Sequence, residues 1–318
     1  MAPTSALRVA FVGAGYMTSE HLRAFAACPD VELVGIHSRS THRVAALTKT
    51  FPGLDVFSSI EALYNDTNAD LVVIAVPELA CQTVCEQAFQ HPWTLLIEKP
   101  VGYTLKQARQ IEQTAEKLGA KAYVALNRRF YGSTLLLQNA LQSTEGPRVV
   151  TILDQEDAES ALAAGQPAEV VHNWMYANSI HLIDYFSQLC RGEHIGTKVM
   201  TPWNPDNPGL VVAQLQFNSG DIGVYQAVWN APGPWSVAVS TAPLRAELRP
   251  IEQLSLQIAG SRHAELQSAD PLDQQFKPGL LRQAQAAILA AKNQATTLPN
   301  LKEANRSMAL VASIYGME

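Results

Sequence analysis

Leu7–Phe25 reads LRVAFVGAGYMTSEHLRAF, and this stretch carries the strongest indication of the fold. Its first residues form an apolar run rich in β-branched side chains, which is typical of a buried parallel strand. The run ends at Gly13-Ala14-Gly15, and apolar residues then recur at helical spacing. A strand, a glycine turn and a helix in this order predict the first unit of a dinucleotide-binding fold. Gly13 would allow the tight turn, and Gly15 would let the backbone approach a pyrophosphate at the helix N-terminus.

The glycine motif departs from the usual pattern at its third position. Gly or Ala there permits close packing of the helix on the strand, whereas this chain has Thr18. A glycine-bearing turn between a strand and a helix also occurs in α/β proteins that bind no nucleotide. This stretch alone therefore leaves both interpretations open. If a cofactor binds here, we expect it to contact the turn and the first helical residues, Tyr16 and Met17.

Length and composition limit the class of protein. The 318 residues suffice for two domains, and 47% hydrophobic with 16% charged residues suits a globular enzyme. A net charge of −6 without a basic cluster argues against nucleic-acid and anionic-membrane partners. No apolar run approaches the length of a membrane span, and the N-terminus lacks the pattern of a signal peptide, so we expect a cytoplasmic protein. The four cysteines form no CxxC pair and the histidines are scattered, so we expect free thiols and no metal site.

The end of the second strand bears on the choice of cofactor. Val31–Ile36 is the predicted strand, and NAD-binding proteins place a carboxylate on the ribose near its end. Residues 37–43 read HSRSTHR and contain no carboxylate. Arg39, with hydroxyl help from Ser38 or Ser40, can bind a 2′-phosphate in a forked contact, which favours NADP(H) over NAD(H). The alternative is that the arginines of this segment only mark the solvated start of a helix.

Alternating strands and helices continue along the first half of the chain. Residues 69–76 form a strongly apolar strand that stops at Pro77, and residues 94–97 form the next one. The carboxyl ends of such strands meet at one edge of the sheet, where Val76 and Pro77 would border the nicotinamide end of the cofactor crevice.

The last of these strands ends in Glu98-Lys99-Pro100. The proline holds Lys99 in an extended backbone at the carboxyl end of a central strand, where a lysine can donate a hydrogen bond or relay a proton. Glu98 and Lys99 taken alone are equally typical of an exposed salt-bridging pair.

Three segments together resemble a known family. VGAGYM, the IAVP strand and LLIEKPVGYTLKQARQIEQTAEKLGAKAYVALNRRF follow one another over residues 7 to about 131. This order resembles the glucose–fructose oxidoreductase / inositol dehydrogenase (Gfo/Idh/MocA) family, and its EKP triplet is more specific than the glycines. The resemblance implies that Lys99 is the catalytic lysine, with Glu98 and Lys99 beside the cofactor. It also implies oxidation or reduction of sugars, cyclitols or nucleotide sugars with NAD(H) or NADP(H).

The resemblance implies two domains. Residues 1–126 would be a Rossmann domain with a parallel sheet. Residues 127–318 would be an α+β domain with an open, mostly antiparallel sheet and helices on one face, serving substrate binding and oligomerisation, with room for the last helix to pack back on the first domain. The alternating strand pattern over 210–258 agrees with this, and residues 157–168 are expected to form a mobile surface loop. An uncovered sheet face suggests a homodimer or homotetramer.

The predicted helix that begins at Asn178 or Ser179 carries the second catalytic candidate. His181 followed by Asp184 matches the resemblance, which implies that His181 exchanges a proton with the substrate hydroxyl and that Asp184 supports it. Many family dehydrogenases have an Asp four residues before this His, but this chain has Ala177. Asn178 and Tyr176 are the polar candidates that remain nearby.

Other substrate contacts are less determined. Asn127 and Arg129 resemble family positions that line the crevice. Trp174, Trp229 and Trp235 can stack on a sugar or base, or simply belong to the core.

The sequence thus predicts an NADP(H)-dependent oxidoreductase that transfers hydride to or from a sugar, nucleotide sugar or related polyol. The alternative is a catalytically weak cofactor-binding sensor or scaffold protein of the same fold, which the alanine at 177 motivates. An α/β protein without a dinucleotide is a third interpretation.

Overall fold

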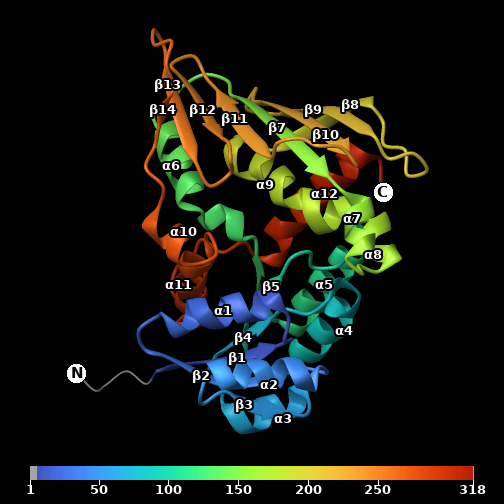
Figure 1. Ribbon diagram of the computed structural model, residues 1–318, viewed down its shortest axis with the longest axis vertical. Helices are drawn as coiled ribbons and strands as arrows, with labels where there is room; N and C mark the ends of the chain where they lie inside the picture. The colour runs from blue at the N-terminus through green and yellow to red at the C-terminus, as the bar shows by residue number, and fades with distance from the viewer. Residues whose placement is uncertain (1–5, 318) are drawn as a thin grey trace. The chain divides into compact units, whose positions relative to one another are not determined.

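The computed structural model describes residues 6–317, so residues 1–5 and residue 318 lie outside the described part of the chain. The chain divides into two compact units (Figure 1). The first unit contains residues 6–102, 106–127 and 275–304, and the second contains residues 103–105, 128–274 and 305–317. Among residues 6–317, the helices are too short or too polar to cross a membrane.

A six-stranded parallel sheet forms the centre of the first unit, in the order β3-β2-β1-β4-β5-β6. Its strands are β1 (Leu7–Val12), β2 (Val31–His37), β3 (Asp55–Phe57), β4 (Leu71–Ile74), β5 (Thr94–Glu98) and β6 (Lys121–Ala125). The strand order reverses between β1 and β4, and in open α/β sheets ligands bind at the carboxyl ends of strands at such a point. The predicted Rossmann fold is confirmed.

Helices cover both faces of this sheet. They are α1 (Tyr16–Ala26), α2 (Thr41–Thr50), α3 (Ile60–Thr67), α4 (Glu78–Ala88), α5 (Leu105–Leu118) and α11 (Leu280–Ala291). Successive side chains of a strand point to opposite faces. Ala10 and Val12 of β1 accordingly join one buried cluster with α3, α4 and α5, whereas Phe11 packs edge-on against Phe25 of α1. The helix α11, which comes from the last part of the chain before α12 (Leu301–Tyr315), packs on α1 and on β4 and β5.

The second unit is built on an eight-stranded sheet in the order β14-β13-β12-β11-β7-β10-β9-β8. Its strands are β7 (Val149–Glu156), β8 (His194–Thr201), β9 (Leu210–Phe217), β10 (Ile222–Trp229), β11 (Ser236–Ser240), β12 (Leu244–Leu248), β13 (Leu254–Ile258) and β14 (Glu265–Leu266). Neighbours are antiparallel except β7 and β10, which run parallel. The predicted open, mostly antiparallel sheet is confirmed.

Alternating burial shows that one face of this sheet is covered. Val150 and Ile152 of β7 and Tyr225 of β10 are fully buried, whereas Val149 and Leu210 on the opposite face are 39% and 45% exposed. The helices of the covered face include α6 (Gly132–Leu141), α9 (Ile180–Leu189) and α12 (Leu301–Tyr315), which lie beside the sheet in Figure 1.

Two short elements correct the prediction of a loop over residues 157–168. α7 (Ala158–Ala163) forms because the Asp157 side chain accepts a hydrogen bond from the Ser160 backbone at 2.8 Å and caps the helix. α8 (Ala168–His172) follows after residues 164–167. The edge strand β8, the two-residue β14 and α10 (Pro271–Gln275) were not anticipated either, because they bury few side chains and so lack a clear apolar period.

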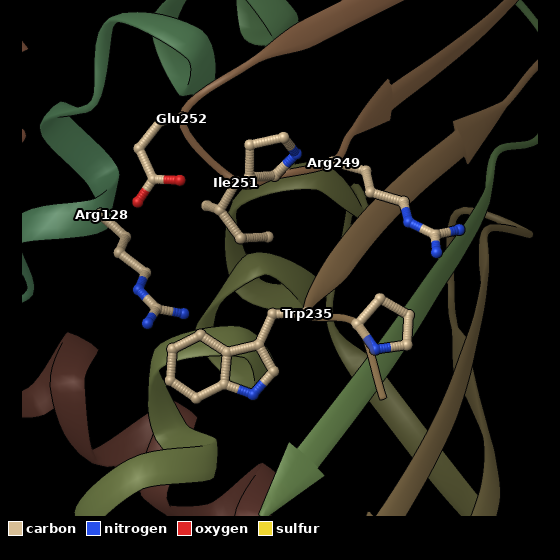
Figure 2. A pocket seen from close by; sticks show the side chains of 7 residues that line it. Arg128, Trp235, Arg249, Ile251 and Glu252 are labelled. Carbon is tan, nitrogen blue, oxygen red and sulfur yellow. The ribbon is translucent and has the colours of Figure 1, made fainter. Parts of the chain in front are cut away.

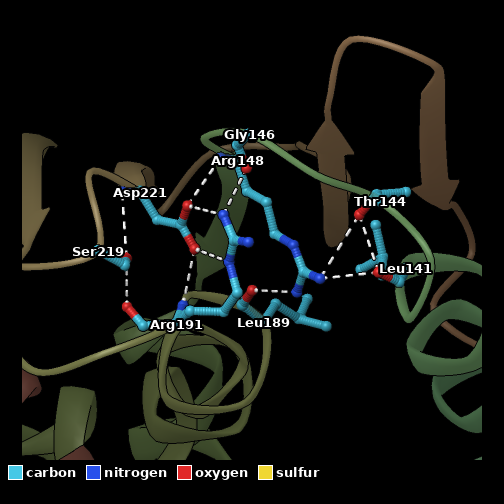
Figure 3. Close-up of polar contacts among 8 residues, drawn as sticks. All are labelled: Leu141, Thr144, Gly146, Arg148, Leu189, Arg191, Ser219 and Asp221. Atoms are coloured by element: carbon cyan, nitrogen blue, oxygen red, sulfur yellow. Dashed lines mark hydrogen bonds and ion pairs between the residues drawn. The ribbon is translucent and has the colours of Figure 1, made fainter.

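A buried carboxylate holds the turn between β9 and β10 (Figure 3). Asp221 is 1% exposed and accepts hydrogen bonds from the backbone N–H of Arg148 and of Arg191, both at 2.8 Å. The Arg191 guanidinium adds two further bonds, at 3.0 and 2.7 Å. Burial acts to raise the pKa of Asp221, but the hydrogen bonds and the charge of Arg191 outweigh it and lower the pKa to about 2.

Replacing Asp221 by asparagine tests this anchor. A pKa lowered from 3.8 to about 2 corresponds to roughly 2 kcal/mol of unfolding free energy at neutral pH. Because the folded-state pKa is depressed, this contribution is present above about pH 4 and is lost as the pH falls towards 2. We therefore expect D221N to be less stable at pH 7 and to converge with the wild type near pH 2, as measured by urea denaturation followed by tryptophan fluorescence. The exposed Asp206→Asn variant is the control; a stability gap independent of pH would contradict the assignment.

Candidate functional site

The glycine turn after β1 is fixed between two neighbouring strand ends. Gly13 has a φ of +111°, and a Cβ atom there would lie 2.0 Å from the carbonyl oxygen of Ala75. The Gly13 N–H donates to the carbonyl of His37 at 2.8 Å, and the Ala75 N–H donates to that of Val12 at 2.8 Å. Only glycine satisfies both the dihedral angle and the contact at this position. Val76 lies against the same turn.

The helix α1 begins directly after this turn, and the space around its N-cap residue is open. Gly15 is the N-cap residue, and a Cβ atom added there would meet nothing within 4 Å. The first turn carries no acidic side chain, and Tyr16 is 67% exposed while Met17 is half-buried. Backbone N–H groups at such a helix end attract a phosphate. Thr18, at the third motif position, is fully buried and faces the core side of the helix. The turn, including Ala14, therefore fits a dinucleotide pyrophosphate.

The segment after β2 presents hydroxyl groups and a cation. The backbone N–H of Ser40 donates to Oγ of Ser38 at 3.3 Å, and Ser40 Oγ lies 3.2 Å from Nδ1 of His42. Arg39 is exposed, and among residues 6–317 it takes part in no ion pair. Its guanidinium is thus placed to meet a ligand from solvent, and the predicted role of Ser38, Arg39 and Ser40 in cofactor binding stays a prediction.

Glu98 links α1 to Lys99. Its Oε1 lies 2.7 Å from Nε2 of His21, a fully buried residue of α1, and its Oε2 accepts the backbone N–H of Lys99 at 3.2 Å. Glu98 is therefore not the exposed salt-bridge partner that the alternative interpretation of the triplet assumed. Lys99 is half-buried at the carboxyl end of β5. Pro77, exposed at the start of α4, follows the end of the neighbouring strand β4.

A π-helical turn precedes α9 in the second unit. This turn, η2 (Met175–Ser179), leads directly into α9, and His181 is half-buried in the first turn of that helix. Such turns insert an extra residue into a helix and occur frequently at functional sites. Ala177, in the middle of the turn, is 3% exposed. The buried Tyr176 donates its hydroxyl to the carbonyl of Met317 at 3.2 Å.

Two buried carboxyl groups on β7 support this turn. Asp154 and Glu156 are 3% and 0% exposed and lie on the same face of the strand. Glu156 accepts hydrogen bonds from Nδ2 of Asn178 at 2.8 Å and from the hydroxyl of Ser179 at 2.9 Å. Burial, and then the negative charge of Asp154, raise the pKa of Glu156 well above its ordinary value. The amide of Asn178, a predicted substrate residue, is thus directed towards Glu156.

Asp154 belongs to a buried chain of hydroxyl groups. It accepts the hydroxyl of Tyr225 at 2.7 Å, and the hydroxyl oxygens of Tyr225 and Tyr315 are 2.8 Å apart. Burial raises the pKa of Asp154 against the hydrogen bonds that lower it. The sequence analysis missed both acids, although extending the alternation of Val150 and Ile152 by two more steps would have placed them on the buried face.

The other predicted substrate residues make internal contacts. Arg129 binds Asp184 through two hydrogen bonds, at 2.8 and 2.6 Å, which is the bidentate geometry of a strong ion pair. Asp184 also accepts the hydroxyl of Ser307 at 2.6 Å. In the first unit, the side-chain amide of Asn127 donates to the carbonyl of Pro278 at 3.1 Å. These contacts hold the Arg129 and Asn127 side chains in place, and the contacts of these two side chains with a substrate stay predictions.

The His, Cys and acidic side chains of the described residues do not gather into a cluster that could hold a metal ion. Residues 6–317 contain no group of three or more His, Cys, Asp or Glu side chains with suitable geometry. Cys81 and Cys85 are buried thiols with sulfur atoms 3.9 Å apart.

The parallel sheet, the glycine turn and the open helix N-terminus define a nucleotide-binding Rossmann domain. Residues 7–126 match the family described as "Oxidoreductase family, NAD-binding Rossmann fold", GFO_IDH_MocA. This N-terminal region thus matches the Gfo/Idh/MocA family, as the sequence motifs predicted.

Individual relatives agree with this family. The chain is 32% identical over 136 residues to the uncharacterized oxidoreductase YdgJ of Escherichia coli, covering 42% of this chain and 38% of that protein. It is 24% identical over 212 residues to glucose-6-phosphate 3-dehydrogenase of Bacillus subtilis, covering 62% and 57%. The matches thus span about 40 to 60% of the length of these curated relatives.

The fold of the whole chain also has solved counterparts. A dehydrogenase from Chromobacterium violaceum superimposes with a TM-score of 0.85 at 17% identity, over 99% of this chain and 96% of that one. This likeness extends the shared fold to the second unit.

The buried pair on β7 predicts how stability changes with pH. Because the pKa of Glu156 is raised in the folded state, the folded protein binds more protons than the unfolded chain at pH values between the ordinary and the raised pKa, and stability falls as the pH rises across that interval. One proton changes the unfolding free energy by at most about 1.4 kcal/mol per pH unit. Glu156→Gln keeps the shape and stays neutral, so we expect a flatter decline of stability between pH 5 and 9, measured by urea denaturation. The exposed Glu169→Gln should retain the wild-type slope, and equal slopes in all three proteins would contradict the assignment.

Proposed function

We propose that this protein is an NADP(H)-dependent oxidoreductase that transfers hydride to or from a sugar, nucleotide sugar or related polyol. One observation carries the proposal: the glycine turn follows the end of β1, and Lys99 follows the end of β5 in the same Rossmann sheet. The contact between His21 of α1 and Glu98 of β5 joins these two parts. When bound, the nicotinamide supplies or accepts the hydride. The similarity to a glucose-6-phosphate 3-dehydrogenase supports a sugar-like substrate.

Lys99 and His181 are assigned the proton chemistry. The Lys99 ammonium donates a hydrogen bond to the substrate oxygen and relays its proton. The His181 imidazole takes or returns the hydroxyl proton, because the pKa of histidine lies near working pH. Asn178, held by Glu156, and Tyr176 complete the polar lining on the side of His181, and Asn127 and Arg129 contribute further substrate contacts. Residues 1–126 would bind the cofactor, and residues 127–318 would bind the substrate.

The open face of the second unit's sheet is proposed as the surface of a homodimer or homotetramer. Exposed apolar side chains on that face, Val149 and Leu210, support this. A cytoplasmic location and a small-molecule partner, rather than nucleic acid or a membrane, complete the proposal.

The second candidate function is a catalytically weak cofactor-binding sensor or scaffold. Ala177 favours it, because an uncharged, buried side chain at this position cannot orient the His181 ring or raise its basicity. Tight NADPH binding without turnover across sugars, nucleotide sugars, aldehydes and imines would favour this candidate over the first.

Replacing Arg39 by alanine tests the choice of cofactor. A hydrogen-bonded charge pair contributes about 1.5–3 kcal/mol, so we expect NADPH affinity to fall about 10- to 100-fold while NADH affinity changes little. Titration followed by nicotinamide fluorescence measures both. Arg43→Ala, in the exposed first turn of α2, is the matched control. Equal affinities of the wild type for the two cofactors would reject the role of Arg39.

Replacing Lys99 by alanine tests the catalytic assignment. Loss of a general acid–base group lowers kcat by about 10²- to 10⁴-fold, and we expect the affinity for NADPH to stay within about threefold. Steady-state kinetics on the best substrate of the screen, together with cofactor titration, separates the two effects. Lys106→Ala, exposed in α5, controls for loss of a nearby positive charge. Unchanged turnover in K99A would remove Lys99 from the mechanism.

A further inference from the structure

We propose that the second unit contains a binding pocket for the carboxylate or phosphate group of a small molecule, centred on the Arg128 guanidinium. This goes beyond the proposed oxidoreductase function, because it assigns a ligand chemistry to a cavity that none of the residues in that proposal lines. The cavity has a volume of about 320 Å³, which lies at the small end of the range for ligand sites. Figure 2 shows Arg128, Trp235 and Glu252 around one side of it.

Arg128 is a buried cation with unused hydrogen-bonding capacity. Arg128 is 8% exposed, and its Nη1 donates no hydrogen bond to any group within residues 6–317. A guanidinium stays protonated at all ordinary pH values, so it cannot avoid this cost by losing its charge. A ligand oxygen that accepts from Nη1 would recover the lost hydrogen bond, and an anionic oxygen would gain the most.

The surroundings hold this guanidinium in place. Its Cζ lies 4.3 Å from the centre of the Trp235 ring, a cation–π contact. The ring is itself oriented, because its Nε1 donates to the carbonyl of Gln155 at 2.8 Å. The planar fork of arginine on a locked ring is pre-organised, so binding an anion costs little side-chain entropy.

The opposite wall is a fixed hairpin turn between β12 and β13. The backbone N–H of Arg249 donates to the carbonyl of Gln253 at 3.2 Å, and the carbonyl of Ile251 accepts the buried hydroxyl of Ser133 at 2.7 Å. Ser133 lies on α6, so the turn is attached to that helix. The pocket therefore has two walls with defined geometry, each anchored by hydrogen bonds.

The charges in the lining leave a positive excess. Arg128 and Arg249 face one carboxylate, Glu252, and no ion pair joins Arg128 to Glu252 in the described chain. The charge of Arg128 also acts on the buried Asp154, where it lowers the pKa of that carboxyl group while burial raises it. Glu252 is exposed and opposes an anion at Arg128, so its removal should tighten binding.

A matched series of three sugars tests the proposal. Glucose, glucuronate and glucose 6-phosphate share a ring and differ only in an uncharged, carboxylate or phosphate group. We expect isothermal titration of the full chain without nicotinamide to show at least tenfold tighter binding of one or both charged sugars than of glucose. The tighter of the two identifies whether the natural ligand carries a carboxylate or a phosphate.

Two substitutions with opposite expected effects locate the binding. Arg128→Gln should weaken the charged sugar about 10- to 100-fold and leave glucose unchanged. Glu252→Gln, at an exposed position that does not threaten folding, should tighten it several-fold, whereas the exposed Glu265→Gln should not. Arg39→Ala should retain the binding, which separates this pocket from the cofactor proposal. No preference for the charged sugars, or a preference that Glu252→Gln leaves unchanged, would overturn the proposal.

Discussion

The contact between Gly13 and Ala75 is the constraint on which the nucleotide-binding unit depends. The chain turns within three residues after β1, and Gly13 in this turn has a φ of +111°. The neighbouring carbonyl of Ala75 leaves room at Gly13 for a hydrogen atom but not for a side chain. The same turn brings the end of β1 into hydrogen-bonding distance of the ends of β2 and β4. The position of the α1 N-terminus, and hence of the open backbone at Gly15, follows from this arrangement.

The second unit is organised around β7. This strand pairs in parallel with β10 and antiparallel with β11, so it lies at the centre of the sheet. Its buried face begins with Val150 and Ile152 and ends with Asp154 and Glu156, so the apolar part stabilises the sheet and the polar part holds η2. A single strand therefore supports both the core and the turn that precedes His181.

Much of the fold could be predicted from the sequence because the hydrophobic patterns of its strands are clear. The strands of the first unit are continuous apolar runs, and the alternation of β9 and β10 marks a sheet with one covered face. The helix α7 could not be foreseen from periodicity, since it is six residues long and starts from the cap at Asp157. Of the site, the sequence indicated the glycine turn and Lys99. It missed Glu156 and Arg128, because a buried charge is unexpected in a strand or beside a tryptophan until the residues that surround it in space are known.

The buried contact between His21 and Glu98 has a consequence for how this domain can vary. The Glu98 carboxylate contacts the His21 imidazole of α1 through one oxygen and accepts the backbone N–H of Lys99 on the other. The position of α1 relative to the main chain of Lys99 is therefore held by this one carboxylate. A substitution at position 21 would remove this contact from the domain interior, so an apolar side chain of similar size could fill the space at His21 but could not hold Glu98 in place.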